Sequence, residues 1–179
     1  MLPEVRNLVD EIAVARATLI RQVEHLTSDE GAFKPTSESW SAAEVVEHLV
    51  WAEHAGLSNI MIAMEAWRRG DPVWTGHNPA RDETIDTIIE NTWQPKETAP
   101  STAEPTWGGP LDYWLMFLGS CQQVVEDVAY RIQAGELDEV VYPHFISGPL
   151  TLRQRLGFLR YHMEHHLRQV NEILRALPA

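Results

Sequence analysis

The sequence has 179 residues, 44% of them hydrophobic and 22% charged, a composition typical of one soluble globular domain spanning residues 1–179. The formal net charge of −12, from 26 acidic and 14 basic residues, argues against general nucleic-acid binding, which requires clustered lysine and arginine. The single cysteine, Cys121, excludes an intramolecular disulfide and a thiolate-rich metal site.

The N-terminal residues do not have the pattern of a targeting segment. Residues 1–6 lack a basic region followed by an apolar run, and no stretch approaches roughly 18 uninterrupted apolar residues. We therefore expect no membrane association and a reducing cytoplasmic location.

Two long amphipathic helices are predicted in the first part of the chain. Apolar residues recur at three- and four-residue steps over residues 3–26 and again over residues 42–69. Ser41 and Glu44 have the spacing of a capping box at the start of the second helix. Gly70-Asp71-Pro72 ends it.

Two further long helices and one short helix are predicted in the rest of the chain. A short helix fits residues 83–93, and helical spacing returns over residues 111–133. Thr151 and Gln154 can form a second capping box, which opens a last helix that ends near Leu177. No segment shows a convincing strand alternation. The pattern predicts an all-α fold, a four-helix bundle with a short extra helix.

A long proline-rich loop is predicted between the second and third long helices, from Pro95 to Pro110. Its four regularly spaced prolines and the Gly108-Gly109 pair cannot continue a helix. Long loops inside compact domains are usually functional covers or mobile segments.

The last predicted helix carries three histidines within five residues. His162 and His166 are four residues apart, so their rings project from one face, whereas His165 points outward and is expected to be solvated. Two imidazoles one turn apart form a preformed bidentate site for a divalent metal. His48 of the second helix could supply a third ligand. The alternative is that His162 and His166 are polar residues of a bundle seam and that His48 is a boundary residue.

Three glutamates are candidates for a role beside such a metal. Glu47, Glu53 and Glu164 are near the histidines in sequence and could hold a ligand in place or accept a proton; we name Glu53 and Glu164 as candidate catalytic residues. His144 lies in an irregular connection that could fold over the end of the bundle, and its role stays open.

These residues resemble the DinB-like (damage-inducible) superfamily of four-helix metalloproteins. The resemblance rests on Trp40 to Leu49, on Gly148 to Thr151, and on His162, His166 and Gln169. It implies a divalent ion, usually zinc or nickel, held by three histidines, and often a homodimer. The ligands it implies are His48, His162 and His166.

Several functions are compatible with this resemblance. Relatives include bacterial low-molecular-weight-thiol S-transferases and thiol-dependent isomerases, so the leading hypothesis is a metal-dependent enzyme that activates a thiol for transfer to a small electrophilic substrate. Metal-dependent hydrolysis with a glutamate as base is a second possibility, and a carboxylate close to the metal would favour it. The third is a non-catalytic metal-binding stress-response bundle.

Overall fold

The structure is a computed structural model that describes residues 1–93 and 99–178. Within these ranges the elements are α1 (Pro3–Val23), α2 (Ser28–Ala32), α3 (Ala42–Arg68), α4 (Ile85–Thr92), α5 (Leu111–Arg131), α6 (Glu136–Glu139), β1 (Val141–His144), β2 (Gly148–Thr151) and α7 (Leu152–Arg175). The long helices α1, α3, α5 and α7 form the predicted four-helix bundle, and α4 is the predicted short helix. None of the described helices is both long and apolar enough to cross a membrane.

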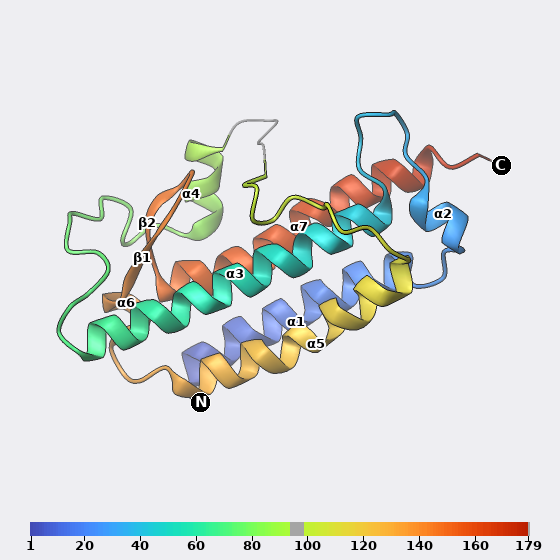
Figure 1. The fold of residues 1–179 in the computed structure, drawn as a ribbon. Helices are drawn as coiled ribbons and strands as arrows, with labels where there is room; N and C mark the ends of the chain where they lie inside the picture. The colour runs from blue at the N-terminus through green and yellow to red at the C-terminus, as the bar shows by residue number, and fades with distance from the viewer. Residues whose placement is uncertain (94–98, 179) are drawn as a thin grey trace.

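The direction of the long helices explains the long connection between the second and the third. Figure 1 shows that α1 and α7 run one way along the bundle and that α3 and α5 run the other way. α1 packs against α5 and α7, and α3 packs against the same two helices. Because α3 and α5 are parallel, the chain between them must travel back along the bundle. α3 and α7 are therefore neighbours, as a site shared between them requires.

Both predicted capping boxes form. The Ser41 hydroxyl accepts the Glu44 amide at 3.2 Å, and the Glu44 carboxylate accepts the Ser41 amide at 2.8 Å. Thr151 and Gln154 make the same reciprocal pair at 3.2 and 2.9 Å. Each box fixes where its helix begins, and it thereby fixes the face on which each later side chain lies.

The bundle core consists of two apolar clusters with a buried polar layer between them. One cluster contains residues from the first half of α1 and the second half of α3. The other contains residues from the second half of α1 and the first half of α3. In the layer between them, the Arg16 guanidinium donates hydrogen bonds to the Glu53 carboxylate and to the Gln122 side-chain carbonyl. Cys121 is buried near this layer, and burial raises the pKa of its thiol to about 12, so it is inert.

A two-stranded hairpin was not predicted. β1 and β2 pair antiparallel from Val141 opposite Thr151 to His144 opposite Gly148. The strands have four residues each and place Pro143 opposite Pro149, so they carry neither the alternation nor the hydrogen-bonding capacity by which strands are recognised in sequence. The hairpin lies against α3 and α7, at the side of the bundle where α4 also packs.

The predicted proline-rich loop is confirmed where it is described. Residues 95–98 lie outside the described residues, and residues 99–110 contain turns and bends but neither helix nor strand. The Glu47 carboxylate on α3 accepts the backbone N–H groups of Trp107 at 2.7 Å and Gly108 at 3.0 Å. This part of the loop is thus tied to α3 rather than free in solvent.

Candidate metal centre

Three buried histidines meet where α3 faces α7. His48 comes from α3, and His162 and His166 come from successive turns of α7. The Nε2 atom of His162 lies 3.2 Å from Nε2 of His48 and 3.0 Å from Nε2 of His166. The structure therefore brings together all three residues that the sequence proposed as ligands.

Hydrogen bonds at the opposite ring nitrogens set the tautomers of two of these histidines. Nδ1 of His48 lies 2.7 Å from the carbonyl oxygen of Ala103, and Nδ1 of His166 lies 2.8 Å from the side-chain oxygen of Gln169. An oxygen of this kind only accepts, so each Nδ1 carries the proton and each Nε2 carries a lone pair. The Nε2 atom of His162 carries at most one proton, so it can donate a hydrogen bond to only one of the two Nε2 lone pairs that face it.

Burial keeps the three rings neutral. The pKa values of His162 and His166 lie well below their usual range, first because burial disfavours the charged form and then because of the neighbouring imidazoles. Burial also lowers the pKa of His48, more than its bond to Ala103 raises it. Neutral imidazoles are the form that binds a metal.

The geometry of the three nitrogens fits one divalent ion. One nitrogen from each ring lies within 4.8 Å of the others. Two nitrogens on a tetrahedral ion, at about 2.0–2.1 Å each, lie roughly 3.3 Å apart, close to the 3.0 and 3.2 Å found here. A cation among the rings would also relieve the contact between lone pairs. Three protein nitrogens leave at least one coordination position open, which is the arrangement of catalytic rather than structural sites.

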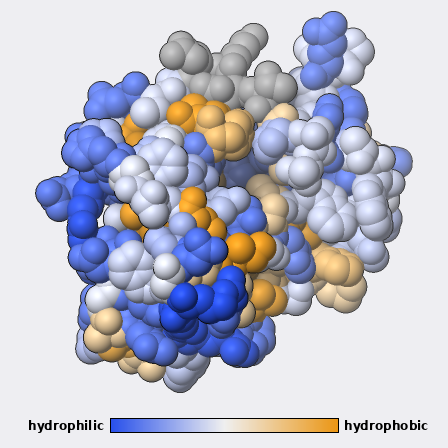
Figure 2. Space-filling model, turned by 60° about the vertical axis from the view of Figure 1, so that its left-hand side comes forward, coloured by the Kyte–Doolittle hydropathy of each residue, from blue (hydrophilic) through white to orange (hydrophobic). Residues whose placement is uncertain are grey.

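A cavity of about 800 Å³ opens beside the three rings. Its walls come from α3, α7, the β1–β2 hairpin and parts of two loops. They include Ala52, Ala55 and Gly56, whose small size leaves space above His48. The space-filling view in Figure 2 shows this side of the molecule hollowed, with hydrophobic residues beside the hollow. A small molecule can therefore reach the histidines from solvent.

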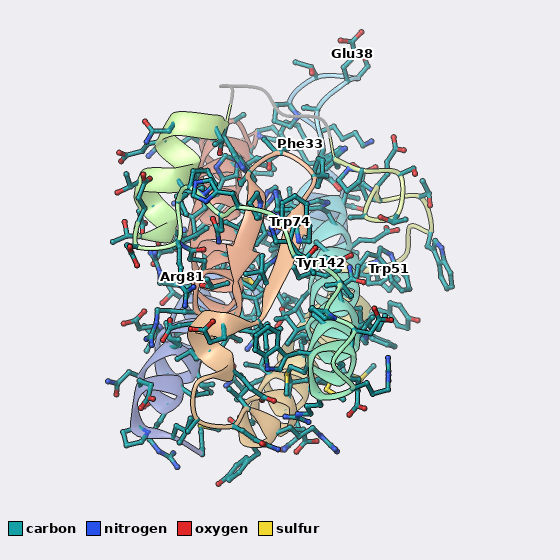
Figure 3. The ribbon with its side chains drawn as sticks, turned by 90° about the vertical axis from the view of Figure 1, so that its left-hand side faces the viewer. Phe33, Glu38, Trp51, Trp74, Arg81 and Tyr142 are labelled. Atoms are coloured by element: carbon teal, nitrogen blue, oxygen red, sulfur yellow. The ribbon has the colours of Figure 1, made fainter. Side chains whose placement is uncertain are left out.

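Aromatic side chains form much of the cavity wall. The Trp40 ring lies 5.0 Å from the His48 ring, centroid to centroid, and the Phe158 ring stacks on His162 at 5.3 Å. Tyr142 and Phe145 of the hairpin also line the cavity. Figure 3 shows Tyr142 on the hairpin side that faces α3. The wall suits a ligand with an apolar or aromatic segment.

Neither predicted catalytic glutamate lines the cavity. Glu53 lies in the buried polar layer and pairs with Arg16. Glu164 pairs with Arg160 on α7 at 2.6 Å, in a surface groove beside α1. Five helical positions separate Glu53 from His48, which turns the two side chains about 140° apart on the helix. Closeness in sequence was the only signal for both glutamates, and it does not bring either to the histidines.

His165 differs from its predicted environment. It is half-buried rather than solvated, because the Trp93 ring, just after α4, packs edge-on against it with centroids 5.7 Å apart. Burial, followed by the charge of Arg168, lowers its pKa. It points away from the bundle as predicted by the helical wheel, but α4 covers that face.

His144, whose role the sequence left open, lines the cavity from the hairpin. Its Nδ1 accepts the backbone N–H groups of Ile146 and Ser147 at 3.3 and 3.2 Å, so the proton of the neutral ring is on Nε2. Burial, with a smaller contribution from the Arg155 charge, lowers its pKa to about 3. His144 is therefore neutral at physiological pH and is a hydrogen-bond donor rather than a proton carrier.

Sequence reasoning missed two contributors to the site. The Ala103 carbonyl is a backbone group, which side-chain motifs cannot identify. Arg155 of α7 lines the cavity, although at its position it resembles any polar residue of an amphipathic helix. Arg155 and His162 are seven residues apart, which places both on one face of α7. This spacing is the one sequence signal that could have indicated Arg155 as a cavity residue.

Comparisons with known proteins find a matching family and similar folds. The sequence profile of the DinB superfamily matches residues 11–170. A comparison with curated protein sequences finds no significant match. Two solved structures have a similar fold at low sequence identity. One is YfiT from Bacillus subtilis, described as "a probable metal-dependent hydrolase with an unusual four-helix bundle topology", with a TM-score of 0.63 and 15% identity over 98% of this chain and 89% of that one. The other is a conserved protein from Enterococcus faecalis, with a TM-score of 0.57 and 15% identity over 98% of each chain.

Proposed function

Since the chain belongs to the DinB superfamily, we propose that it is a metal-dependent enzyme that activates a low-molecular-weight thiol for transfer to an electrophile. One observation carries the proposal: three neutral histidines direct Nε2 atoms to a common point in the wall of a cavity of about 800 Å³. Zinc and nickel are the ions we expect from the family resemblance, and imidazole nitrogen is a suitable ligand for both.

The residues of the centre would have separate roles. His48, His162 and His166 would hold the ion, which, when bound, supplies a positive charge that lowers the pKa of an adjacent thiol. Ala103 and Gln169 hold two of the rings in the tautomer that leaves Nε2 free. The aromatic wall would place the electrophile beside the sulfur.

The proposed reaction is a nucleophilic substitution. The thiol loses its proton to solvent, the sulfur forms a bond to the electrophilic carbon, and the leaving group departs with the electron pair of the bond that breaks. The reaction therefore does not require a protein side chain to act as a general base for the thiol proton. This agrees with the cavity, whose histidines are all neutral at physiological pH.

The distribution of carboxylates favours thiol transfer over hydrolysis at the same centre. Hydrolysis needs a general base close to the reacting water. Among the described residues, Glu38 is the one carboxylate that lines the cavity, and it is exposed on the loop before α3. Figure 3 shows Glu38 on a loop that extends away from the body of the protein. An accessible cavity also argues against a metal that only stabilises the fold.

A conjugation assay tests the proposal. A panel of bacterial low-molecular-weight thiols is incubated with an activated aryl chloride and the protein, either loaded with zinc or nickel or treated with a chelator. We expect conjugation by the metal-loaded protein for at least one thiol, loss in His48→Ala, and retention in His165→Ala, whose side chain does not line the cavity. Equal rates with and without metal across the whole panel would refute the proposal.

A further inference from the structure

A buried arginine lies in the cavity wall without an acidic partner among the described residues. The Arg155 residue is 8% exposed. Its Nε donates to the carbonyl oxygen of Tyr142 at 3.0 Å, its Nη2 donates to that of Pro143, and its guanidinium lies over the Tyr142 ring at 4.7 Å from the centroid. No carboxylate in residues 1–93 or 99–178 forms an ion pair with it.

This environment is unusual for a charged side chain. Two carbonyls and the Tyr142 ring stabilise the guanidinium in part, but no opposite charge among the described residues neutralises it, and buried charges in proteins are normally paired. Burial lowers the pKa of Arg155 to about 10, so the group remains a cation at neutral pH. By contrast, the other largely buried arginine, Arg16, pairs with Glu53.

Arg155 lines the same cavity as the histidines. Nη1 makes no hydrogen bond to any described residue, and Arg155 lines the cavity together with Phe158 and His162. Seven residues separate Arg155 from His162, two turns on one face of α7, which corresponds to about 10 Å along the helix axis. Phe158 lies between them, one turn from each, and gives that part of the wall an apolar surface.

We propose that Arg155 binds a carboxylate of the substrate, so that the preferred substrate is an acid with an apolar or aromatic segment between the carboxylate and the reacting end. One guanidinium with one free nitrogen neutralises a single charge, which suits a carboxylate better than a doubly charged phosphate. The net charge of −12 likewise disfavours a more highly charged anion. The carboxylate can belong to the electrophile or to the thiol. This inference rests on the proposed function for the identity of the reacting end.

Binding rather than turnover tests the carboxylate site. Phenylbutyrate and phenylbutanol have the same apolar segment and differ in the charge at one end. Their affinities for the zinc-loaded protein are measured by calorimetry. We expect the wild-type protein to bind the acid at least about tenfold more tightly than the alcohol, because a charge-assisted hydrogen bond to a desolvated arginine is made only by the acid.

Four variants test which residue causes the preference for the acid over the alcohol. In Arg155→Gln this preference should disappear while the affinity for the alcohol is unchanged. An unchanged affinity for the alcohol also shows that the cavity is intact. Arg155→Lys keeps the charge and part of the hydrogen bonding to the hairpin carbonyls, so it should keep a reduced preference even if the glutamine variant does not fold. Arg153→Gln is the matched control, because Arg153 pairs with Asp138 and does not line the cavity. His166→Ala tests whether the acid binds at the metal instead.

The results separate this inference from the proposed function. The inference that Arg155 binds a carboxylate is overturned if the wild type shows no preference for the acid. It is also overturned if folded Arg155→Gln or Arg155→Lys keeps the full preference, or if Arg153→Gln or His166→Ala loses the preference. Conjugation assays with carboxylated and uncharged forms of each reactant then show which of the two carries the acid. If no thiol is conjugated but the preference depends on Arg155, the acid site stands and the proposed reaction fails.

Discussion

The carbonyl oxygen of Ala103 lies 2.7 Å from Nδ1 of His48. A residue of the proline-rich loop thus sets the tautomer of a proposed metal ligand on α3. The same loop is held to α3 by Glu47, which accepts two of its backbone N–H groups. The loop is therefore part of the proposed metal centre, and its attachment to α3 should affect metal binding.

Glu47→Gln is expected to weaken this attachment. Glu47 is fully buried, and the amide replaces one acceptor oxygen with a donor, so one backbone N–H of Trp107 or Gly108 loses its partner. We expect a loss of about 1–3 kcal/mol in the free energy of unfolding and a decrease in zinc affinity of up to about tenfold. Urea denaturation and zinc titration measure the two effects. Glu65→Gln, an exposed glutamate on the same helix, is the control and should change neither.

Glu53 should make stability depend on pH. Burial, opposed by Arg16, raises the pKa of Glu53 from 4.5 to about 7. The folded protein then binds this proton more tightly than the unfolded chain, so the contribution is fully present below about pH 4.5 and is lost as the pH rises through about 7. The loss is at most about 3 kcal/mol.

Comparison with Glu53→Gln isolates this contribution, because the other titrating groups are common to both proteins. Denaturation from pH 5 to pH 8, in roughly half-unit steps, should show the wild type losing stability relative to the variant as the pH rises. Parallel pH profiles for the two proteins would show that Glu53 titrates normally.

Two glycines test the packing of α4 on α7. A Cβ on Gly157 would lie 3.0 Å from Cγ2 of Ile85, the first residue of α4, whose branched side chain has little freedom to move. Gly157→Ala should therefore lower the free energy of unfolding by about 1–3 kcal/mol. Gly119→Ala, in the middle of α5 with open space around it, should raise it by about 0.5–1 kcal/mol. Stabilisation by both substitutions in thermal denaturation would contradict the close contact between α4 and α7.

The long helices were predictable because their determinants are local. Apolar periodicity and the capping pairs Ser41–Glu44 and Thr151–Gln154 act within a few residues, and the observed ends differ from the predicted ones by no more than about three residues. The histidine pair on α7 was equally local. The residues alone made His48 one possible third ligand, and the family resemblance strengthened that choice, since no local rule states that α3 and α7 are neighbours.

The remaining features depend on contacts between distant segments. The hairpin strands are short and contain prolines, so their pairing has no periodic signal. The burial of His165 depends on where Trp93 packs, and the buried pair of Glu53 with Arg16 joins two helices. A helical wheel gives the direction of a side chain but not the segment that it meets. The homodimer, the cytoplasmic location and the single domain over residues 1–179 stay predictions.

The metal content of the purified protein tests the central claim most directly. Wild type, His166→Ala and His165→Ala are equilibrated with zinc, dialysed and measured by elemental analysis. His165 is the matched control, because it is adjacent to His166 but its ring is directed toward Trp93 and does not line the cavity. We predict about one zinc per chain in the wild type and His165→Ala, and a large loss in His166→Ala. Equal zinc content in the wild type and His166→Ala would contradict the account.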